Sequence, residues 1–141
     1  MSYATQTDLQ VRLGAEDLGI VADTEGVDKK NVAAIDAALL DGCGKIDAAV
    51  EARYALPLAA PVPQILVRIN VDLAVYYLAR TWDRMSDLII QRHAEACADL
   101  MLIAKGTIGL GLASPPATLG IGADFSSNPR LFTRDTQKGL L

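Results

Sequence analysis

The segment that decides the fold is residues 31–53, which read NVAAIDAALLDGCGKIDAAVEAR. Apolar side chains recur in it at steps of three and four residues, the spacing that places them on one face of an α-helix. Charged residues such as Asp36 and Lys45 lie off this stripe. The pattern predicts a long amphipathic helix that buries one face. The stripe consists of Val32, Ile35, Leu39, Cys43, Ile46 and Val50.

Two glycines, Gly42 and Gly44, lie inside this predicted helix. Each costs roughly 1 kcal/mol relative to alanine in a helix interior. Close approach of a neighbouring helix would offset that cost, and a kink in the helix is the alternative interpretation.

The next long segment, residues 64–80, is apolar on almost every side. Such a helix is typical of the centre of a bundle or of a contact between subunits. Only Gln64, Arg68 and Asp72 form a polar stripe, at steps of four residues, and we expect a weak ion pair between the last two. Prolines between the two long segments predict an extended connector.

Two further helices complete the predicted bundle. Thr5 suits the N-cap of a short helix that ends at Gly14. A helix over residues 86–105 is expected to stop at Gly106. Its predicted core face consists of Ile89, Ala96, Leu100 and Ile103.

Outside these helices the chain is more irregular. We expect a helical turn at residues 15–21 and a polar loop at residues 23–28. After residue 106 the chain becomes rich in glycine and proline, and residues 107–112 have the composition of a short strand. The predicted fold is therefore all-α, a small bundle of about four to five helices over residues 1–106, followed by an extended C-terminal arm over residues 107–141. An arm that is apolar but without helical period is expected to become ordered on a partner.

Composition narrows the class of protein. A length of 141 residues fits one domain, and 51% hydrophobic but only 5% aromatic residues predict a core of alanine, leucine, isoleucine and valine. A net charge of −4, with scattered cations, argues against a general phosphate-binding surface. The mean hydropathy of +0.25 is high. Because excess apolar surface is usually covered by a partner, we expect oligomerisation.

The sequence predicts neither a membrane span nor secretion. The uncharged stretches at residues 54–67 and 106–123 are broken by prolines or glycines, so neither fits a membrane-spanning helix. The first residues lack the basic and apolar regions of a secretion signal. Two isolated cysteines without a CxxC pattern fit a reducing compartment.

We predict no catalytic, cofactor or metal site, and hence no enzyme. His93 precedes Cys97 by four residues on one helical face. A metal site would need further ligands, and a Cys–His nucleophile pair would need an exposed cleft, so a structural role is favoured for both residues. The glycine patterns of the arm, at residues 109–111 and 120–122, lack the Lys-Ser/Thr of a phosphate-binding loop. Tyr76, Tyr77 and Trp82 are interpreted as core or interface anchors.

Three stretches together resemble a family of Mu-like phage and prophage proteins encoded in the head gene cluster. They are YATQTDL at residues 3–9, IDAAVEARYALPL at residues 46–58 and FTRDTQKG at residues 132–139. The order and spacing match over nearly the whole chain, although Gly42, Gly44 and the Gly-Pro-rich stretch depart from the pattern. The family is similar in turn to helical head-completion proteins of long-tailed phages, which form rings, usually of twelve copies, below the portal.

The resemblance implies a head–tail connector that assembles in the host cytoplasm and resides in the neck of the virion. Its implied partners are further copies of itself, the portal protein, and a neck or tail-completion protein, with DNA passing through the ring without specific binding. The residues predicted to bind the portal or a neighbouring subunit are Arg53, Tyr54, Leu131, Phe132, Thr133, Arg134, Asp135 and Lys138.

Two alternatives stay open at this point. The first is a tail-completion protein or a chaperone-like assembly helper, and presence in purified virions separates a connector from a helper. The second is a small helical DNA-binding or enzymatic protein, which would need a basic recognition helix or a polar pocket. Salt-dependent DNA binding would favour the second alternative.

Overall fold

Four α-helices make up the part of the chain that the computed structural model describes, residues 2–14, 31–81 and 83–113. They are α1 (Gln6–Leu13), α3 (Val32–Val50), α4 (Gln64–Thr81) and α5 (Asp87–Lys105), and the described residues contain no strand. The predicted all-α fold class is confirmed. The predicted turn and loop between α1 and α3, and most of the C-terminal arm, lie outside the described residues.

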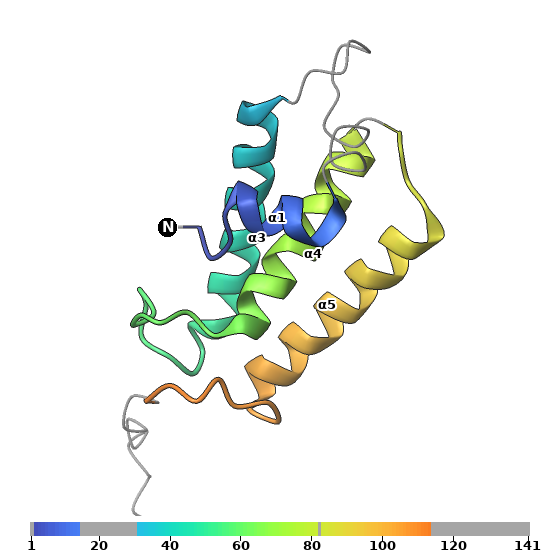
Figure 1. The fold of residues 1–141 in the computed structure, drawn as a ribbon. Helices are drawn as coiled ribbons and strands as arrows, with labels where there is room; N and C mark the ends of the chain where they lie inside the picture. The colour runs from blue at the N-terminus through green and yellow to red at the C-terminus, as the bar shows by residue number, and fades with distance from the viewer. Residues whose placement is uncertain (1, 15–30, 82, 114–141) are drawn as a thin grey trace, which may run out of the picture.

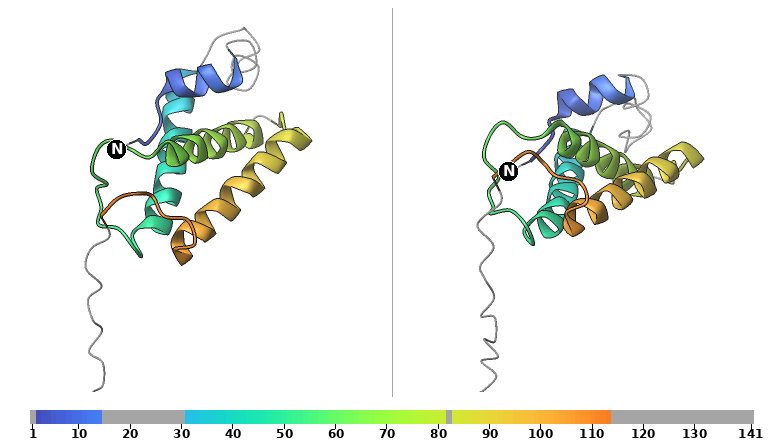
Figure 2. Two further views of the ribbon diagram at one scale, coloured as in Figure 1. Left: turned by 60° about the horizontal axis from the view of Figure 1, so that its bottom comes forward. Right: turned by 90° about the horizontal axis from the view of Figure 1, so that it is seen from below.

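Helix α4 occupies the middle of the bundle (Figure 1). Helices α3 and α5 lie on either side of it, and α1 packs across α4. Figure 2 shows that α3 and α5 approach each other at their C-terminal ends and diverge toward their N-terminal ends. Because α4 contacts all three other helices, its side chains are buried around most of its circumference. This is the burial that the apolar segment at residues 64–80 predicts.

Local capping explains where the helices begin and end. The Thr5 side chain accepts a hydrogen bond from the Asp8 amide, and the Asp8 carboxylate accepts one from the Thr5 amide, so a capping box starts α1. At the start of α5 the Ser86 side chain accepts a hydrogen bond from the Ile89 amide. Gly106, with φ of 79°, ends α5 in the left-handed conformation that glycine adopts without strain. The predicted helix boundaries at Thr5, Gly14 and Gly106 are confirmed.

Two clusters of buried side chains form the core. The first joins α1, the N-terminal half of α3 and the C-terminal half of α4, with Leu9, Ile35 and Val71 almost fully buried. The second joins the C-terminal half of α3 to the N-terminal half of α4 and to α5, with Ile46 and Leu100 among its members. Helix α4 therefore carries the core from one end of the molecule to the other.

The predicted apolar stripe of α3 is buried except at its first residue. Val32 is 51% exposed because it belongs to the first turn, where no other described helix covers it, so the prediction was wrong at that position. On α5 the predicted core face is confirmed at Ala96, Leu100 and Ile103, and Ile89 is half-buried. The other members of the α3 stripe, all buried, are Ile35, Leu39, Cys43, Ile46 and Val50.

The two glycines of α3 have different environments, although α3 runs as one helix through both. A Cβ atom added to Gly42 would overlap Asn70 Oδ1 of α4 and lie 3.4 Å from Leu73 Cβ. The predicted close approach of a neighbouring helix is thus confirmed at Gly42. At Gly44 a Cβ atom would meet nothing within 4 Å, so within the described chain the prediction is wrong there.

Asn70 has little freedom to move away from Gly42. Its side chain is fully buried, and its amide nitrogen donates to Ser2 Oγ at 3.3 Å. Its Oδ1 atom is buried without a hydrogen-bond partner and points at the space where Gly42 has no side chain. The contact between α3 and α4 therefore depends on a missing methyl group.

The residues that follow α5 pack against the helices instead of forming a strand. The strand predicted at residues 107–112 is absent, and Ile108, Leu110 and Leu112 contact the second core cluster. The amide of Leu110 donates to the hydroxyl of Tyr54 at 3.1 Å, and the described residues offer no strand with which this segment could pair.

We expect opposite effects from alanine at the two glycines. Gly42→Ala forces overlap with Asn70 and should lower the free energy of unfolding by about 1–3 kcal/mol. Gly44→Ala, its matched control, fills open space and should raise that free energy by about 0.5–1 kcal/mol. Chemical denaturation of the purified chains measures both. In an Asn70→Ala background the cost of Gly42→Ala should shrink, and an unchanged cost would contradict the assigned contact.

Candidate partner-binding site

Tyr54, one of the residues predicted to bind a partner, lies just beyond the end of α3. Its side chain is only 8% exposed and packs in the second core cluster. Its hydroxyl accepts the hydrogen bond from the Leu110 amide. In the single chain Tyr54 therefore fixes the first residues of the C-terminal arm to the end of α3.

Arg53 makes a second link at the same end of the bundle. One guanidinium nitrogen donates to the backbone oxygen of Lys105 at 3.4 Å, at the C-terminal end of α5. A cation there also interacts favourably with the negative end of the helix dipole. The structure thus places Arg53 and Tyr54 next to the first residues of the C-terminal arm, which we call the root of the arm (residues 107–112). The other predicted contact residues lie outside the described part of the chain, so a surface that they share with Arg53 and Tyr54 stays a prediction. They are Leu131, Phe132, Thr133, Arg134, Asp135 and Lys138.

Next to α3 lies a recess of about 380 Å³ that the sequence did not reveal. The Tyr3 hydroxyl donates to Asp47 at its wall. Burial and this carboxylate raise the pKa of Tyr3 above its usual range, so the phenol stays neutral. The recess combines the N-terminal segment, α3 and the proline-rich connector, which only the fold brings together. It is lined by Ser2, Tyr3, Asp47, Leu56, Pro57, Leu58 and Val62.

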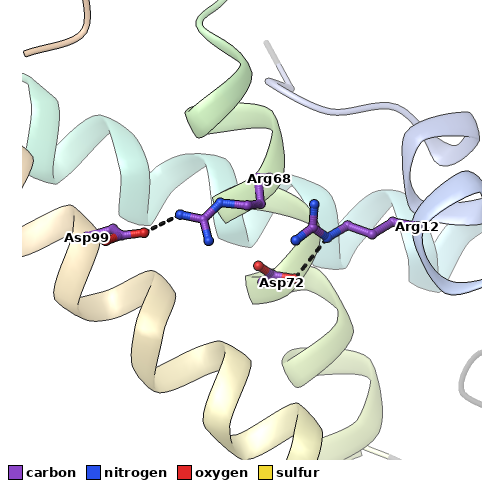
Figure 3. A network of polar contacts seen from close by, with 4 residues as sticks. All are labelled: Arg12, Arg68, Asp72 and Asp99. Atoms are coloured by element: carbon purple, nitrogen blue, oxygen red, sulfur yellow. Dashed lines mark hydrogen bonds and ion pairs between the residues drawn. The ribbon is translucent and has the colours of Figure 1, made fainter.

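Two ion pairs hold α1 and α5 to α4 (Figure 3). Arg12 of α1 approaches Asp72 at 3.4 Å, and Arg68 pairs with Asp99 of α5. Arg68 and Asp72, predicted to pair weakly within α4, are near enough for their charges to interact, but each makes its direct ion contact with another helix. Each side chain finds its opposite charge on another helix, which the spacing along α4 could not show.

Asp72 is the buried member of this network. Its side chain is 4% exposed, whereas Arg12 is 38% exposed. Burial raises the pKa of the Asp72 carboxyl, and Arg12, followed by the nearby Arg68 and Arg92, opposes that rise. The carboxylate is therefore tolerated inside the bundle because α1 supplies its counter-charge.

His93 and Cys97 take part in packing contacts on α5. The His93 ring stacks on Tyr76, with ring centroids 3.7 Å apart, and its Nε2 lies 3.6 Å from Cys97 Sγ. Lys45 of α3 donates to the same sulfur at 3.1 Å. Burial, followed by the charge of Lys45, lowers the pKa of His93 and so favours the neutral ring. No three potential metal-binding side chains gather among the residues placed by the structure.

Several large apolar side chains point away from the core. They belong to α1, α3 and α5, whereas α4 has none among the most exposed ones. No helix among the described residues combines the length and apolar character needed to cross a membrane. Large apolar side chains are thus exposed on three of the four described helices. The most exposed are Val11 (81%), Met101 (63%), Leu40 (57%), Leu88 (55%), Val32 (51%) and Ile90 (49%).

The helices, caps and exposed faces define a small all-α domain with surface suited to protein contacts. Comparison with known proteins shows the family to which this domain belongs. The model of the family described as Bacteriophage Mu, Gp36 matches residues 3–124, and the chain belongs to this family. It is also similar to the Mu-like prophage FluMu protein gp36 of Haemophilus influenzae, with 30% identity over 141 residues that cover 99% of this chain and 98% of that protein. The predicted resemblance to Mu-like phage proteins is confirmed at this level.

Removing the charge of Asp72 should change how stability depends on pH. Because the folded chain raises the pKa of this carboxyl above its ordinary 3.8, the folded state holds the proton more tightly than the unfolded state. The wild-type chain should therefore lose stability relative to Asp72→Asn as the pH rises from about 3 to about 7. Denaturation curves of both chains across this range test the sign, and a difference that moves in favour of wild type would contradict it.

Tyr54→Phe should loosen the root of the arm. It removes the acceptor of the Leu110 amide, and the loss of one such hydrogen bond costs about 1 kcal/mol of unfolding free energy. Amide exchange at Leu110 should accelerate more than exchange within α4. Tyr76→Phe is the matched control, because the Tyr76 hydroxyl makes no hydrogen bond within the described residues. Equal effects of the two substitutions would refute the assignment.

Proposed function

We propose that this chain is a non-catalytic head–tail connector that forms a ring between the portal and the tail of a Mu-like phage. Membership of a Mu phage family supports a role in phage biology. The single observation that carries the connector role is the exposure of large apolar side chains on three different helices, α1, α3 and α5. A ring subunit needs two different surfaces, because each copy contacts the next through a heterologous interface.

The partners follow from this proposal. One face of the ring would bind the portal protein and the other a neck or tail-completion protein. The contact residues would be Arg53 and the arm residues Leu131, Phe132, Thr133, Arg134, Asp135 and Lys138, while Tyr54, predicted as a contact from the sequence, is buried in the core of the single chain. Tyr54 and Leu110 support this role indirectly, because their hydrogen bond fixes the point from which the arm departs. An arm with a fixed root is held near its target, so less entropy is lost when it binds.

The charge of the chain suits a channel for DNA. A net charge of −4 disfavours tight binding to phosphates, so DNA would pass the ring without being retained. The connector would assemble in the host cytoplasm and remain in the neck of the virion. A transient assembly helper would instead be missing from finished particles.

Deleting residues 130–141 should uncouple folding from assembly. If the arm acts only on a partner, as proposed, the circular dichroism and unfolding transition of the truncated chain should match those of the full chain. In cells whose phage lacks a working copy of the gene, the truncated chain should give filled heads and separate tails, counted by electron microscopy. The full-length chain from the same plasmid is the control. Joined particles at the full-length level would contradict the role of the arm.

A further inference from the structure

The recess beside Tyr3 is a mainly apolar hollow. The proline-rich connector supplies Leu56, Leu58 and Val62 to its wall, and its volume of about 380 Å³ is in the range of ligand pockets. Leu56 is 38% exposed, so part of this wall is open to a partner. The recess can therefore receive an apolar side chain.

Two carboxylates stand along one side of the recess, and we call them the acidic edge. Asp47 lines the recess, and the exposed Glu51 follows one turn later on the same side of the chain. No cation in the described part of the chain forms an ion pair with either carboxylate, and Arg53 donates to the end of α5 instead. The N-terminal ammonium group, whose charge acts on Cys43, can balance only one of the two. The acidic edge therefore favours a cationic partner.

The last described residues leave the bundle next to this recess. Ile108 and Leu112 pack on the second core cluster, and so do the recess residues Tyr3, Leu58 and Val62. Figures 1 and 2 show the end of the described chain beside the connector between α3 and α4. The arm therefore departs from the end of the bundle at which the recess lies.

The sequence of the arm contains a large apolar residue between two cations. Both phenylalanines of the chain, Phe125 and Phe132, belong to the arm. Arg130 and Arg134 flank Phe132 at two residues on either side, whereas Asp124 directly precedes Phe125. Attraction to the acidic edge therefore selects the segment around Phe132 over the segment around Phe125.

The length of the arm favours the recess of another copy. Residues 114–130 can span about 60 Å when extended. Helix α3, among the longest described elements, is about 28 Å long. The recess of the same chain lies next to the root of the arm, so a spacer of this length is much longer than that distance requires. The same spacer is long enough to pass across the bundle to an adjacent copy.

We propose that residues 130–134 of one copy dock in the recess of the next copy, with Phe132 on its apolar wall and with Arg130 and Arg134 along the acidic edge. Side chains alternate in an extended segment, so Phe132 and both arginines would face the recess together while Asp135 faces away. The inference rests on the proposed ring and names the segment and the surface that join its copies. Because arm and recess are different surfaces of every copy, the contact can repeat around a ring.

A disulfide between copies tests the contact. In a Cys43→Ala, Cys97→Ser background, one chain carries Thr133→Cys in the arm and another carries Ala59→Cys at an exposed position beside the recess. Both are supplied together to cells whose phage lacks a working copy of the gene. Both keep Phe132 and its flanking arginines, so joined particles should form at the wild-type level before oxidation. After oxidation the mixture should give a linked dimer that contains both variants, because docking brings the two positions within disulfide reach.

Matched variants identify the segment and the copy that dock. Ser126→Cys replaces Thr133→Cys in the control, because each position directly follows a phenylalanine of the arm, and this control should give several-fold less dimer. A single chain that carries both Thr133→Cys and Ala59→Cys separates docking between copies from docking within one copy. Docking between copies gives a ladder of linked chains. An internal disulfide without a ladder would overturn the proposal.

The outcomes separate this inference from the proposed function. If the chain forms a ring in the neck and the dimer through Thr133→Cys does not exceed the Ser126→Cys control, the assigned contact is overturned while the connector role stands. If the dimer forms but the chain is absent from the neck, the connector role fails and the contact between copies stands. Neither a dimer nor a ring would overturn both.

Changes of the anchor and of the charges give a second readout. In the arm chain Phe132→Ala should lower the dimer yield several-fold, and Phe125→Ala should leave it unchanged. In the recess chain Glu51→Lys should lower the yield, and Arg130→Glu or Arg134→Glu in the arm chain should restore it, since opposite charges would again meet. The arginine whose reversal restores the yield gives the direction of the arm in the recess. A yield that neither reversal restores would contradict the role of the acidic edge.

Discussion

The arrangement of this bundle depends on how closely α4 can approach α3. At Gly42 the missing side chain leaves room for the buried Asn70, and this contact positions α4 so that its remaining faces meet α1 and α5. The two core clusters lie on either side of that crossing and share α4 as their common wall. Ion pairs from Arg12 and Arg68 then connect α4 to the outer helices. Removing the close approach would shift every later contact.

The division of apolar side chains links this packing to function. Helix α4 uses its apolar residues for the core, whereas α3 and α5 bury one face and leave large side chains exposed on the other. Leu40 and Met101, both more than half exposed, contribute little to the stability of a single chain. Their position is understandable if the bundle is completed by further proteins.

Much of the fold could be predicted because each helix carries its own period and caps. The all-α class, the burial of α4 and the helix ends at Gly14 and Gly106 depend on local sequence. Two contacts between segments far apart in the sequence were not predicted. The charge partner of Asp72 comes from α1, and the recess beside Tyr3 joins three parts of the chain. Of the predicted contact residues, the structure describes Arg53 and Tyr54, which bond to the end of α5 and to the segment after it. Their role toward a partner stays a prediction.

Imaging of the phage neck by electron cryomicroscopy is the most direct test of the proposed connector role. That role predicts a closed ring of helical density between portal and tail, into which copies of α3, α4 and α5 fit. Tail-attached particles whose neck contains no density for this chain would contradict it.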